Sequence, residues 1–228
     1  MAPPENFKPA LIIVDLQEDF CPPNGSLAVP NGRDIIPTVN SLLNLPFALK
    51  IATKDWHPSD HISFAANHPG KQPFSDFATI INPNNPEEKY DSRLWPVHCV
   101  QNTPGAELIS ELDVGKVDKV IEKGQQKEVE MYSAFYDPLK SPRCSDSGLA
   151  KVLREERVTD VYCVGLAFDY CVKATAVDAG KEGFRTWVVR EGTRGVDAEG
   201  WERVEGELKG EGVSCVDFGG EEVGWVRG

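Results

Sequence analysis

Four short, nearly continuous apolar segments constrain the fold of this chain more than any other feature. They are residues 9–17 (PALIIVDLQ), 116–124 (KVDKVIEKG), 158–167 (VTDVYCVGLA) and 184–193 (FRTWVVREGT). Each is rich in β-branched residues and bounded by turn-forming or charged residues, which is typical of strands buried on both faces of a sheet. Residues 47–56 and 213–218 are weaker candidates of the same kind. The sequence therefore predicts about six strands, most of them parallel.

Segments with helical periodicity separate these strands, at residues 33–43, 145–158, 169–180 and 197–210. Ser145 or Asp146 could cap the second helix, Asp169 could cap the third, and Gly180 could end it. The alternation of strands and helices predicts a three-layer α/β/α fold, with a six-stranded, mostly parallel sheet and helices on both faces. The acidic, glycine-rich stretch from residue 191 is interpreted as a surface helix, an edge strand and a loose tail.

We expect a single domain over residues 1–228, since this length suits one large core. Residues 57–106 interrupt the alternation with a loop-rich excursion that is too long for a plain connection. The segment 82–89 (NPNNPEEK) carries its clearest loop signal. The excursion also contains histidines and aromatic residues, which argue against disorder and favour a functional role.

The net charge of −12 and the pI near 4.8 argue against nucleic acid or an anionic membrane as the main partner. They suit an enzyme that acts on a small molecule. No basic segment followed by an apolar one marks a signal peptide at the N-terminus, so we expect a cytoplasmic protein, with the nucleus and the peroxisome left open. The six cysteines form no CxxC pair, which predicts reduced thiols.

Reactive side chains follow the predicted strands. Asp15 ends the first apolar run, Asp55 and His57 end the second, Lys123 ends the third, and the fourth leads into Cys171 at a helix start. The carboxyl ends of parallel strands meet at one edge of a sheet, so these groups should converge. The positive end of a helix dipole favours a thiolate, a carboxylate can take the thiol proton, and an ammonium can stabilise the resulting charge.

A second set of residues has the composition of a metal site. Asp55 and His57 lie two residues apart and so point to the same face of a strand, and His98 also follows an apolar pair. One carboxylate and two imidazoles leave an open coordination position on a divalent metal ion. His61 and His68 compete for the same role, and the spacing alone does not rank them.

Several motifs together resemble one enzyme family. They are ALIIVDLQEDFCPPNGSLAV, ATKDWHPSDHISFAANHPG, LWPVHCVQNTPGAEL, VIEKG, MYSAFYD and GLAFDYCVKATAVDAG. In this order they resemble the fungal-type nicotinamidases of the isochorismatase-like cysteine hydrolase superfamily, from about residue 10 to residue 195. The resemblance implies an amidohydrolase that converts nicotinamide to nicotinate and ammonia through a cysteine thioester and feeds NAD salvage.

The resemblance also assigns catalytic roles. It makes Asp15 the general base, Lys123 the catalytic lysine and Cys171 the nucleophile. It places an oxyanion hole at the backbone amides of Ala167 and Cys171, with a cis peptide between Leu166 and Ala167.

The same resemblance assigns the binding residues. It makes Asp55, His57 and His98 the ligands of a divalent metal ion, most often zinc. Aromatic positions of the pyridine pocket correspond to Phe20, Trp95 and Tyr170.

Other functions compete with this interpretation. Within the superfamily, the alternatives are a different amidase or an isochorismatase-type vinyl-ether hydrolase, which does not use the cysteine. Outside it, the alternatives are a binding module or redox sensor that uses Cys171 as a switch, and a catalytically inactive homologue. The sequence leaves open the identity of the metal, the existence of a homo-oligomer, the acceptance of pyrazinamide and any role of Glu130 near the metal.

Overall fold

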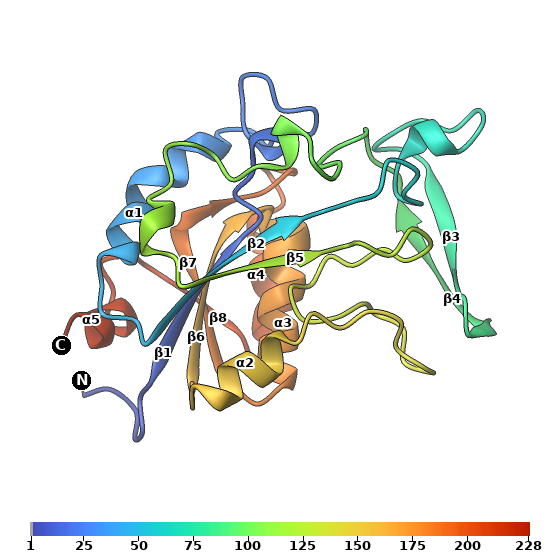
Figure 1. The fold of residues 1–228 in the computed structure, drawn as a ribbon. Coiled ribbons are helices and arrows are strands. Elements are labelled where there is room, and N and C mark those ends of the chain that lie inside the picture. The colour runs from blue at the N-terminus through green and yellow to red at the C-terminus, as the bar shows by residue number, and fades with distance from the viewer. Residues whose placement is uncertain (1) are drawn as a thin grey trace.

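A computed structural model describes residues 2–228 of the chain (Figure 1). Its main sheet has six strands in the order β5-β2-β1-β6-β7-β8, and every neighbouring pair is parallel. The strands are β1 (Pro9–Val14), β2 (Leu49–Asp55), β5 (Lys119–Lys123), β6 (Asp160–Leu166), β7 (Arg185–Arg194) and β8 (Ser214–Val216). All six strands predicted from the sequence are confirmed, the two weaker candidates included.

Helices cover both faces of this sheet, which confirms the three-layer prediction (Figure 1). The five α-helices are α1 (Ile36–Leu43), α2 (Leu149–Glu155), α3 (Lys173–Lys181), α4 (Trp201–Gly210) and α5 (Glu221–Arg227). Helices α1 and α5 pack on one face, and α2, α3 and α4 pack on the other. Short 3-10 turns lie at Glu18–Phe20, Gly32–Ile35, Ala65–Asn67, Pro104–Ala106 and Val114–Lys116.

Strand β1 shows why the apolar runs are continuous. Leu11 and Ile13 face the layer of α1 and α5, whereas Ala10, Ile12 and Val14 face the opposite helices. All of them are fully buried, since a central parallel strand has no solvent-exposed face. The chain moves from β1 to β2 and β5 on one side, then returns to β6 on the other. The crevice at the carboxyl ends of β1 and β6 is therefore the switch point at which such sheets bind ligands.

The excursion at 57–106 contains an antiparallel hairpin that the sequence did not predict. Strand β3 (Phe77–Asn82) pairs with β4 (Asn85–Arg93), and the hairpin stands apart from the six-stranded sheet (Figure 1). The segment interpreted as a loop, 82–89, forms the turn and the first half of β4. Burial alternates along β3, where Ala78 and Ile80 are buried and Phe77 and Ile81 are exposed. The single-domain prediction itself stays a prediction.

Two predicted helix caps are wrong. Neither Ser145 nor Asp146 caps α2, because Gly148 occupies the N-cap position. Asp169 does not cap α3, since its carboxylate accepts the amides of Val196 and Asp197 from the segment after β7. Asp146 instead accepts the amide of Gly148 at 2.8 Å, just before α2 begins.

The C-terminal segment is not a loose tail. Residues Glu221–Arg227 form α5, and the apolar side chains of Val223 and Val226 are buried against the sheet. Trp225 packs edge-on against Trp187 of β7 and against Phe7. The high glycine content obscured this helix because glycine lowers helix propensity without abolishing packing.

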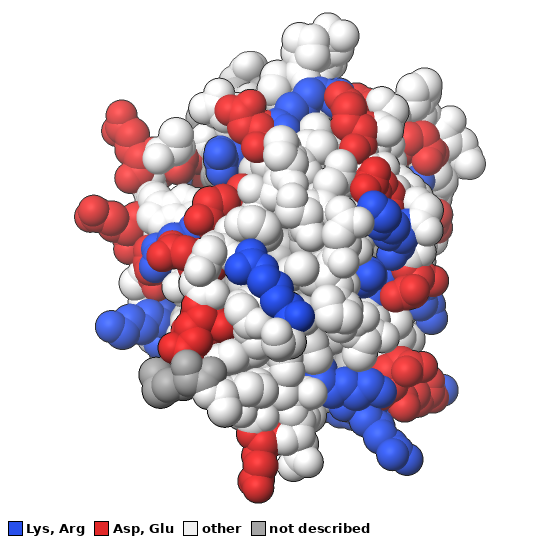
Figure 2. All heavy atoms as spheres, turned by 90° about the vertical axis from the view of Figure 1, so that its left-hand side faces the viewer, with Lys and Arg blue, Asp and Glu red and all other residues white. Residues whose placement is uncertain are grey.

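The surface agrees with the acidic composition. On the face over α1 and α5, basic side chains are interspersed with acidic and uncharged ones and form no continuous basic area (Figure 2).

All six cysteines are free thiols. Within residues 2–228, no helix combines the length and the apolarity that crossing a bilayer requires.

Candidate active site

The ends of β1, β2, β5 and β6 bring together the groups that the sequence predicted would converge. The Lys123 ammonium lies at the centre, fully buried, 2.9 Å from Asp15 Oδ2 and 2.5 Å from Asp55 Oδ1. It also donates to the Met131 carbonyl at 3.2 Å and points at Cys171 Sγ at 3.7 Å. One lysine thus contacts both carboxylates and the thiol.

Asp15 is held by the neighbouring strand. The Thr53 hydroxyl on β2 donates to its Oδ1 at 2.6 Å and accepts its backbone amide at 3.1 Å. The other oxygen, Oδ2, is buried and receives no well-directed hydrogen bond within the described chain, although Lys123 balances its charge. A carboxylate oxygen with a free lone pair beside a thiol is suited to accept the thiol proton.

Burial dominates the protonation of these groups. It raises the pKa of Asp15 to about 6, against the opposing pull of Lys123. Burial also raises the pKa of the Cys171 thiol well above its usual value, and Lys123 offsets only part of this rise. A thiol with a raised pKa depends on a base to lose its proton, which fits the base and the cation that the sequence analysis placed beside Cys171. A carboxylate with a raised pKa is a better base.

Cys171 lies in a single π-helical turn, Phe168–Val172, that precedes α3. The peptide between Leu166 and Ala167 is cis, as the family resemblance implied. The Ala167 carbonyl closes the turn by accepting the amides of Tyr170 and Val172, each at 3.1 Å. Gly165, just upstream, pairs with Val14 so closely that a Cβ there would lie 2.0 Å from the Val14 carbonyl. Only glycine allows β6 to bring this turn so near β1.

Asp55, His57 and His98 form a buried cluster whose ligand atoms lie within 4.8 Å of one another. The Nδ1 atom of His57 lies 2.7 Å from the Gly124 carbonyl, and that of His98 lies 2.8 Å from the Pro96 carbonyl. A carbonyl only accepts, so each Nδ1 carries a proton and each Nε2 is the atom that a metal ion would bind. Burial opposes a charge on His57, but Asp55, whose Oδ2 lies 3.5 Å from Nε2, raises the pKa of His57, so a metal ion would displace a proton from this nitrogen. The three residues therefore fit a divalent metal ion.

Charges within the cluster support the same conclusion. Burial would raise the pKa of Asp55, but Lys123 and His57 hold it well below its usual range. Burial, with the charge of His57, lowers the pKa of His98 to about 4. Asp55 is thus an anion and His98 a neutral imidazole, the protonation states that bind metals.

The histidines that competed in the sequence are excluded by their contacts. His61 uses both ring nitrogens, with Ser63 Oγ at 2.8 Å and the Val129 carbonyl at 3.1 Å. His68 is tied to the Ile62 carbonyl at 2.6 Å and lies outside the cluster. Glu130 is buried, and its Oε1 accepts the amide of Met131 at 2.9 Å. Burial raises the pKa of Glu130, and it is not a member of the cluster.

Gly124 explains how His57 reaches its position. Its φ is +69°, and a Cβ on this residue would lie 2.5 Å from the His57 ring. The left-handed backbone and the missing side chain let the Gly124 carbonyl meet Nδ1 of His57 directly. Two adjacent residues thus act at the site: Lys123 contacts the carboxylates of Asp15 and Asp55, and Gly124 holds the His57 ring.

A cavity of about 340 Å³, including the part open to solvent, joins the thiol to the metal cluster. It is lined by Phe20, Leu27, Val29, Asp55, Trp95, His98, Tyr132, Ala167, Tyr170, Cys171 and Val196. The three aromatic residues predicted for the pocket, Phe20, Trp95 and Tyr170, all lie in its wall. Trp95 and Tyr170 meet edge to face, with ring centroids 4.8 Å apart. The walls are apolar and flat, which suits a small aromatic ligand.

Comparison with known proteins agrees with this geometry. The model of the Isochorismatase domain matches residues 9–217. The chain belongs to the isochorismatase family. Within the family it is 38% identical over 215 residues to the nicotinamidase of Saccharomyces cerevisiae, covering 91% of this chain and 98% of that protein. The resemblance to fungal nicotinamidases is thereby confirmed.

Solved structures of isochorismatase-family relatives show the same fold. The yeast nicotinamidase Pnc1p bound to the inhibitor nicotinaldehyde has a TM-score of 0.86 and 36% identity, covering 92% of this chain and 99% of that one. A pyrazinamidase of Pyrococcus horikoshii in complex with zinc has a TM-score of 0.69 and 38% identity, with coverages of 92% and 99%.

Sequence reasoning missed residues of this isochorismatase-family site that act through neighbours. The buried Gln17 side chain donates to the backbone carbonyls of Asp55 at 2.8 Å and Ala106 at 2.9 Å, and it accepts the Asp55 amide at 2.8 Å. Thr53 lies two positions before Asp55 on β2, so the two side chains share one strand face, and this alternation was a signal for Thr53. Gln17 lies beyond the end of β1, so no strand alternation pointed to it.

Tyr132 was also missed. Its hydroxyl accepts the Trp95 indole N–H at 2.9 Å, and its side chain lines the cavity. It belongs to the motif MYSAFYD, but no strand end or spacing pattern pointed to its place in the wall.

Proposed function

We propose that this chain is a nicotinamidase, a cysteine amidohydrolase that converts nicotinamide to nicotinate and ammonia. One observation carries the proposal: the buried Lys123 ammonium contacts Asp15, Asp55 and Cys171 at once, so the thiol, its base and one residue of the metal cluster meet at a single cation. The similarity to nicotinamidases over nine-tenths of the chain supports the substrate.

The first half of the reaction forms a thioester. Asp15 takes the proton of Cys171, and Lys123 stabilises the thiolate. The sulfur attacks the amide carbon, and the carbonyl electron pair moves to oxygen. We assign the backbone amides of Ala167 and Cys171 to this oxyanion, where each donor is typically worth about 3–4 kcal/mol. Asp15 then passes its proton to the amide nitrogen as the C–N bond breaks, and ammonia leaves.

The second half regenerates the thiol. Asp15 accepts a proton from water, the hydroxide oxygen bonds to the thioester carbon, and the C–S bond breaks. The nicotinic acid that forms loses its proton to solvent and leaves as nicotinate, and Asp15 returns its proton to the Cys171 thiolate. The proposed order gives Asp15 both roles, base and acid, which fits a carboxylate whose pKa is raised to about 6.

We assign Asp55, His57 and His98 as the ligands of a divalent metal ion, with zinc as the first candidate. A bound divalent ion would supply an electrophile that holds the ring nitrogen of a pyridine. Phe20, Trp95 and Tyr170 would then contact the faces and edges of the ring and keep the carboxamide directed at Cys171. The product, nicotinate, suits a role in NAD salvage. The cytoplasmic location and the homo-oligomer remain expectations from the sequence.

The test is ammonia release from nicotinamide by the purified protein, before and after chelation of metal. We expect release to fall on chelation and to return with added zinc. Release indifferent to chelation would remove the metal from the proposal and leave the cysteine chemistry. No release under either condition would overturn the proposed function and favour another amide or a binding role.

A further inference from the structure

A second, outer cleft adjoins the mouth of the catalytic cavity. It encloses about 1030 Å³, including the part open to solvent, and shares Trp95, Tyr170 and Val196 with the inner cavity. Phe74 extends its aromatic wall and meets Trp95 edge to face, with ring centroids 5.8 Å apart. The catalytic steps use no group that belongs to the outer cleft alone.

Three cations line this cleft, and two of them are compensated. Lys173 and Arg203 both bind the carboxylate of Glu207, at 2.8 Å and 3.0 Å. Arg203 also lies 3.4 Å from Asp197. Arg93 differs, because no carboxylate within residues 2–228 lies within ion-pair distance of it. Its Nη1 donates to the Phe74 carbonyl and its guanidinium lies over the Phe77 ring, which leaves Nε and Nη2 without a partner among these residues.

The acidic residues of the cleft are already engaged. Both oxygens of Asp169 accept backbone amides, those of Val196 and Asp197, at 2.9 Å each. Asp197 accepts the amide of Glu199 at 3.2 Å, in addition to its contact with Arg203. The cleft therefore presents, beside an aromatic wall, a guanidinium that has no carboxylate partner among residues 2–228, on a chain whose net charge is −12.

We propose that the outer cleft binds a small aromatic carboxylate, with Arg93 as the partner of the carboxylate and Trp95 and Tyr170 in contact with the ring. A guanidinium fork matches a carboxylate through two parallel hydrogen bonds, and aromatic edges suit a flat ring. If the proposed function holds, the natural ligand is nicotinate, the product, held on the path out of the inner cavity. The identity of the ligand rests on that function, whereas the site itself does not.

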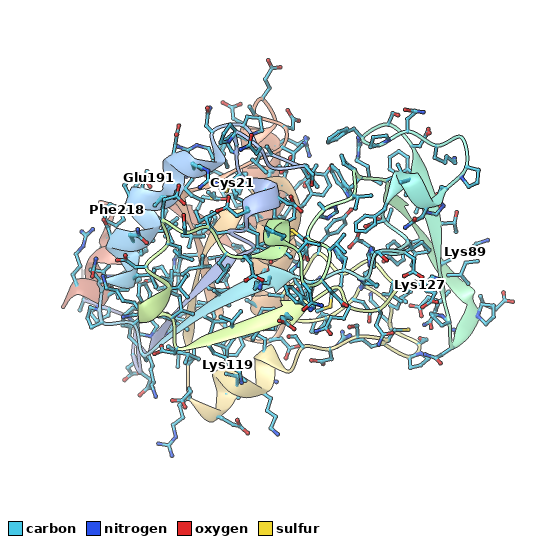
Figure 3. All side chains as sticks on the ribbon, turned by 45° about the horizontal axis from the view of Figure 1, so that its top comes forward. Cys21, Lys89, Lys119, Lys127, Glu191 and Phe218 are labelled. Carbon is cyan, nitrogen blue, oxygen red and sulfur yellow. The ribbon has the colours of Figure 1, made fainter. Side chains whose placement is uncertain are left out.

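Benzoate is the sharpest probe, because it has the carboxylate and the ring but no ring nitrogen for the metal cluster. We would titrate it into the full-length protein and into the variants R93Q, R93K and K89Q by calorimetry. Lys89 lies on the same strand, on the side of the hairpin away from the main sheet, and gives the same change of charge (Figure 3). Benzyl alcohol, the neutral counterpart, measures the ring contact alone.

We expect R93Q to weaken benzoate binding about tenfold or more, since one charge-assisted bidentate pair is lost. R93K should retain part of the affinity, and K89Q should match the wild type. Benzyl alcohol should bind the wild type and R93Q equally, which also shows that R93Q keeps the cleft folded. Equal benzoate affinity in the wild type and R93Q, or no benzoate binding at up to about 10 mM, would overturn the site.

Ammonia release from nicotinamide, measured on the same wild-type preparation, separates this inference from the proposed function. If ammonia is released and benzoate binding does not depend on Arg93, the outer site is wrong and the proposed amidase function stands. If benzoate binding depends on Arg93 but no ammonia is released, the outer site stands and nicotinate is no longer supported as its ligand.

Discussion

The carboxyl edge of the six-stranded sheet and the β3–β4 hairpin contribute to the same cavity in different ways. Along the carboxyl ends of the strands, Asp15 follows β1, Lys123 ends the outermost strand β5, and Cys171 lies in the turn after β6. Contacts with the buried Lys123 ammonium hold them together. The hairpin contributes through neutral hydrogen bonds. Tyr90 on β4 donates to the Glu130 carbonyl at 2.9 Å, and Ser92 Oγ lies 3.3 Å from the Tyr132 hydroxyl.

This contrast indicates that the two regions have different roles. The hairpin supports residues 129–132, which supply Tyr132 to the cavity wall and the Met131 carbonyl to Lys123. Through this segment the hairpin reaches both the cavity wall and Lys123. Variants at the sheet edge should therefore lower kcat, whereas variants of the hairpin should mainly raise KM for the same substrate. Four variants test this division, beginning with the largest expected effect.

Replacing the nucleophile should have the largest effect. We expect Cys171→Ala to lower kcat for nicotinamide hydrolysis by more than about 10⁴-fold, because no other group can form the thioester. The metal content should stay unchanged, since Cys171 is not among the Asp55, His57 and His98 cluster. Ammonia release and metal analysis of the same preparation provide the measurement.

Cys215→Ala is the matched control, because Cys215 is half-buried on β8, far from the cavity in the sheet order. It should keep full turnover. Substantial ammonia release by Cys171→Ala would contradict the assignment of Cys171 as the nucleophile.

Removing the buried lysine should affect both stability and rate. Lys123→Met leaves the carboxylates of Asp15 and Asp55 buried without their shared cation, and a broken buried pair typically costs about 3–5 kcal/mol. The free energy of unfolding from denaturant titration measures this loss. Lys54→Met is the control, because its contact with the exposed Glu107 should contribute about 1 kcal/mol or less. Equal losses in the two variants would contradict a central role for Lys123.

The sheet edge could be predicted from the sequence for a physical reason. A central parallel strand such as β1 must be apolar on both faces, so a charged residue such as Asp15 marks its end. Parallel strands end at a common edge, which brings such residues together before their order in the sheet is known. The cis peptide and the assignment of aromatic residues to the cavity came from the family resemblance instead, since neither follows from spacing.

The hairpin could not be predicted in the same way. Its turn contains prolines and asparagines that also occur in irregular loops, and its outward face carries the apolar residues Phe77 and Ile81, which obscure the alternation. Gln17 shows a second limit, because it acts on the backbone of Asp55 and not on a reacting atom. No residue pattern reports a side chain whose partners are backbone groups of distant loops.

Gln17 should be the most sensitive of the supporting residues at the sheet edge. Gln17→Leu leaves the buried amide and carbonyl of Asp55 without partners, at a typical cost of about 1–3 kcal/mol for each unsatisfied group. We expect the affinity for zinc to fall about 10- to 100-fold, as is usual when a residue that orients a metal ligand is lost. Competition with a chelator measures it. Gln101→Leu, which removes a single bond to the Trp56 carbonyl, should change the zinc affinity little.

The smallest expected effect tests the hairpin side of the comparison. Tyr90→Phe keeps the ring but removes the hydrogen bond to the Glu130 carbonyl, which is worth about 1 kcal/mol. Because this bond positions the segment that carries Tyr132 into the cavity wall, KM for nicotinamide should rise about three- to fivefold with kcat nearly constant. Thr79→Val, on the exposed face of β3, removes a side-chain bond within the same hairpin and should leave both constants unchanged. A fall in kcat with constant KM in Tyr90→Phe would mean that the hairpin acts on Lys123 through Met131, and the division between wall and chemistry would then be wrong.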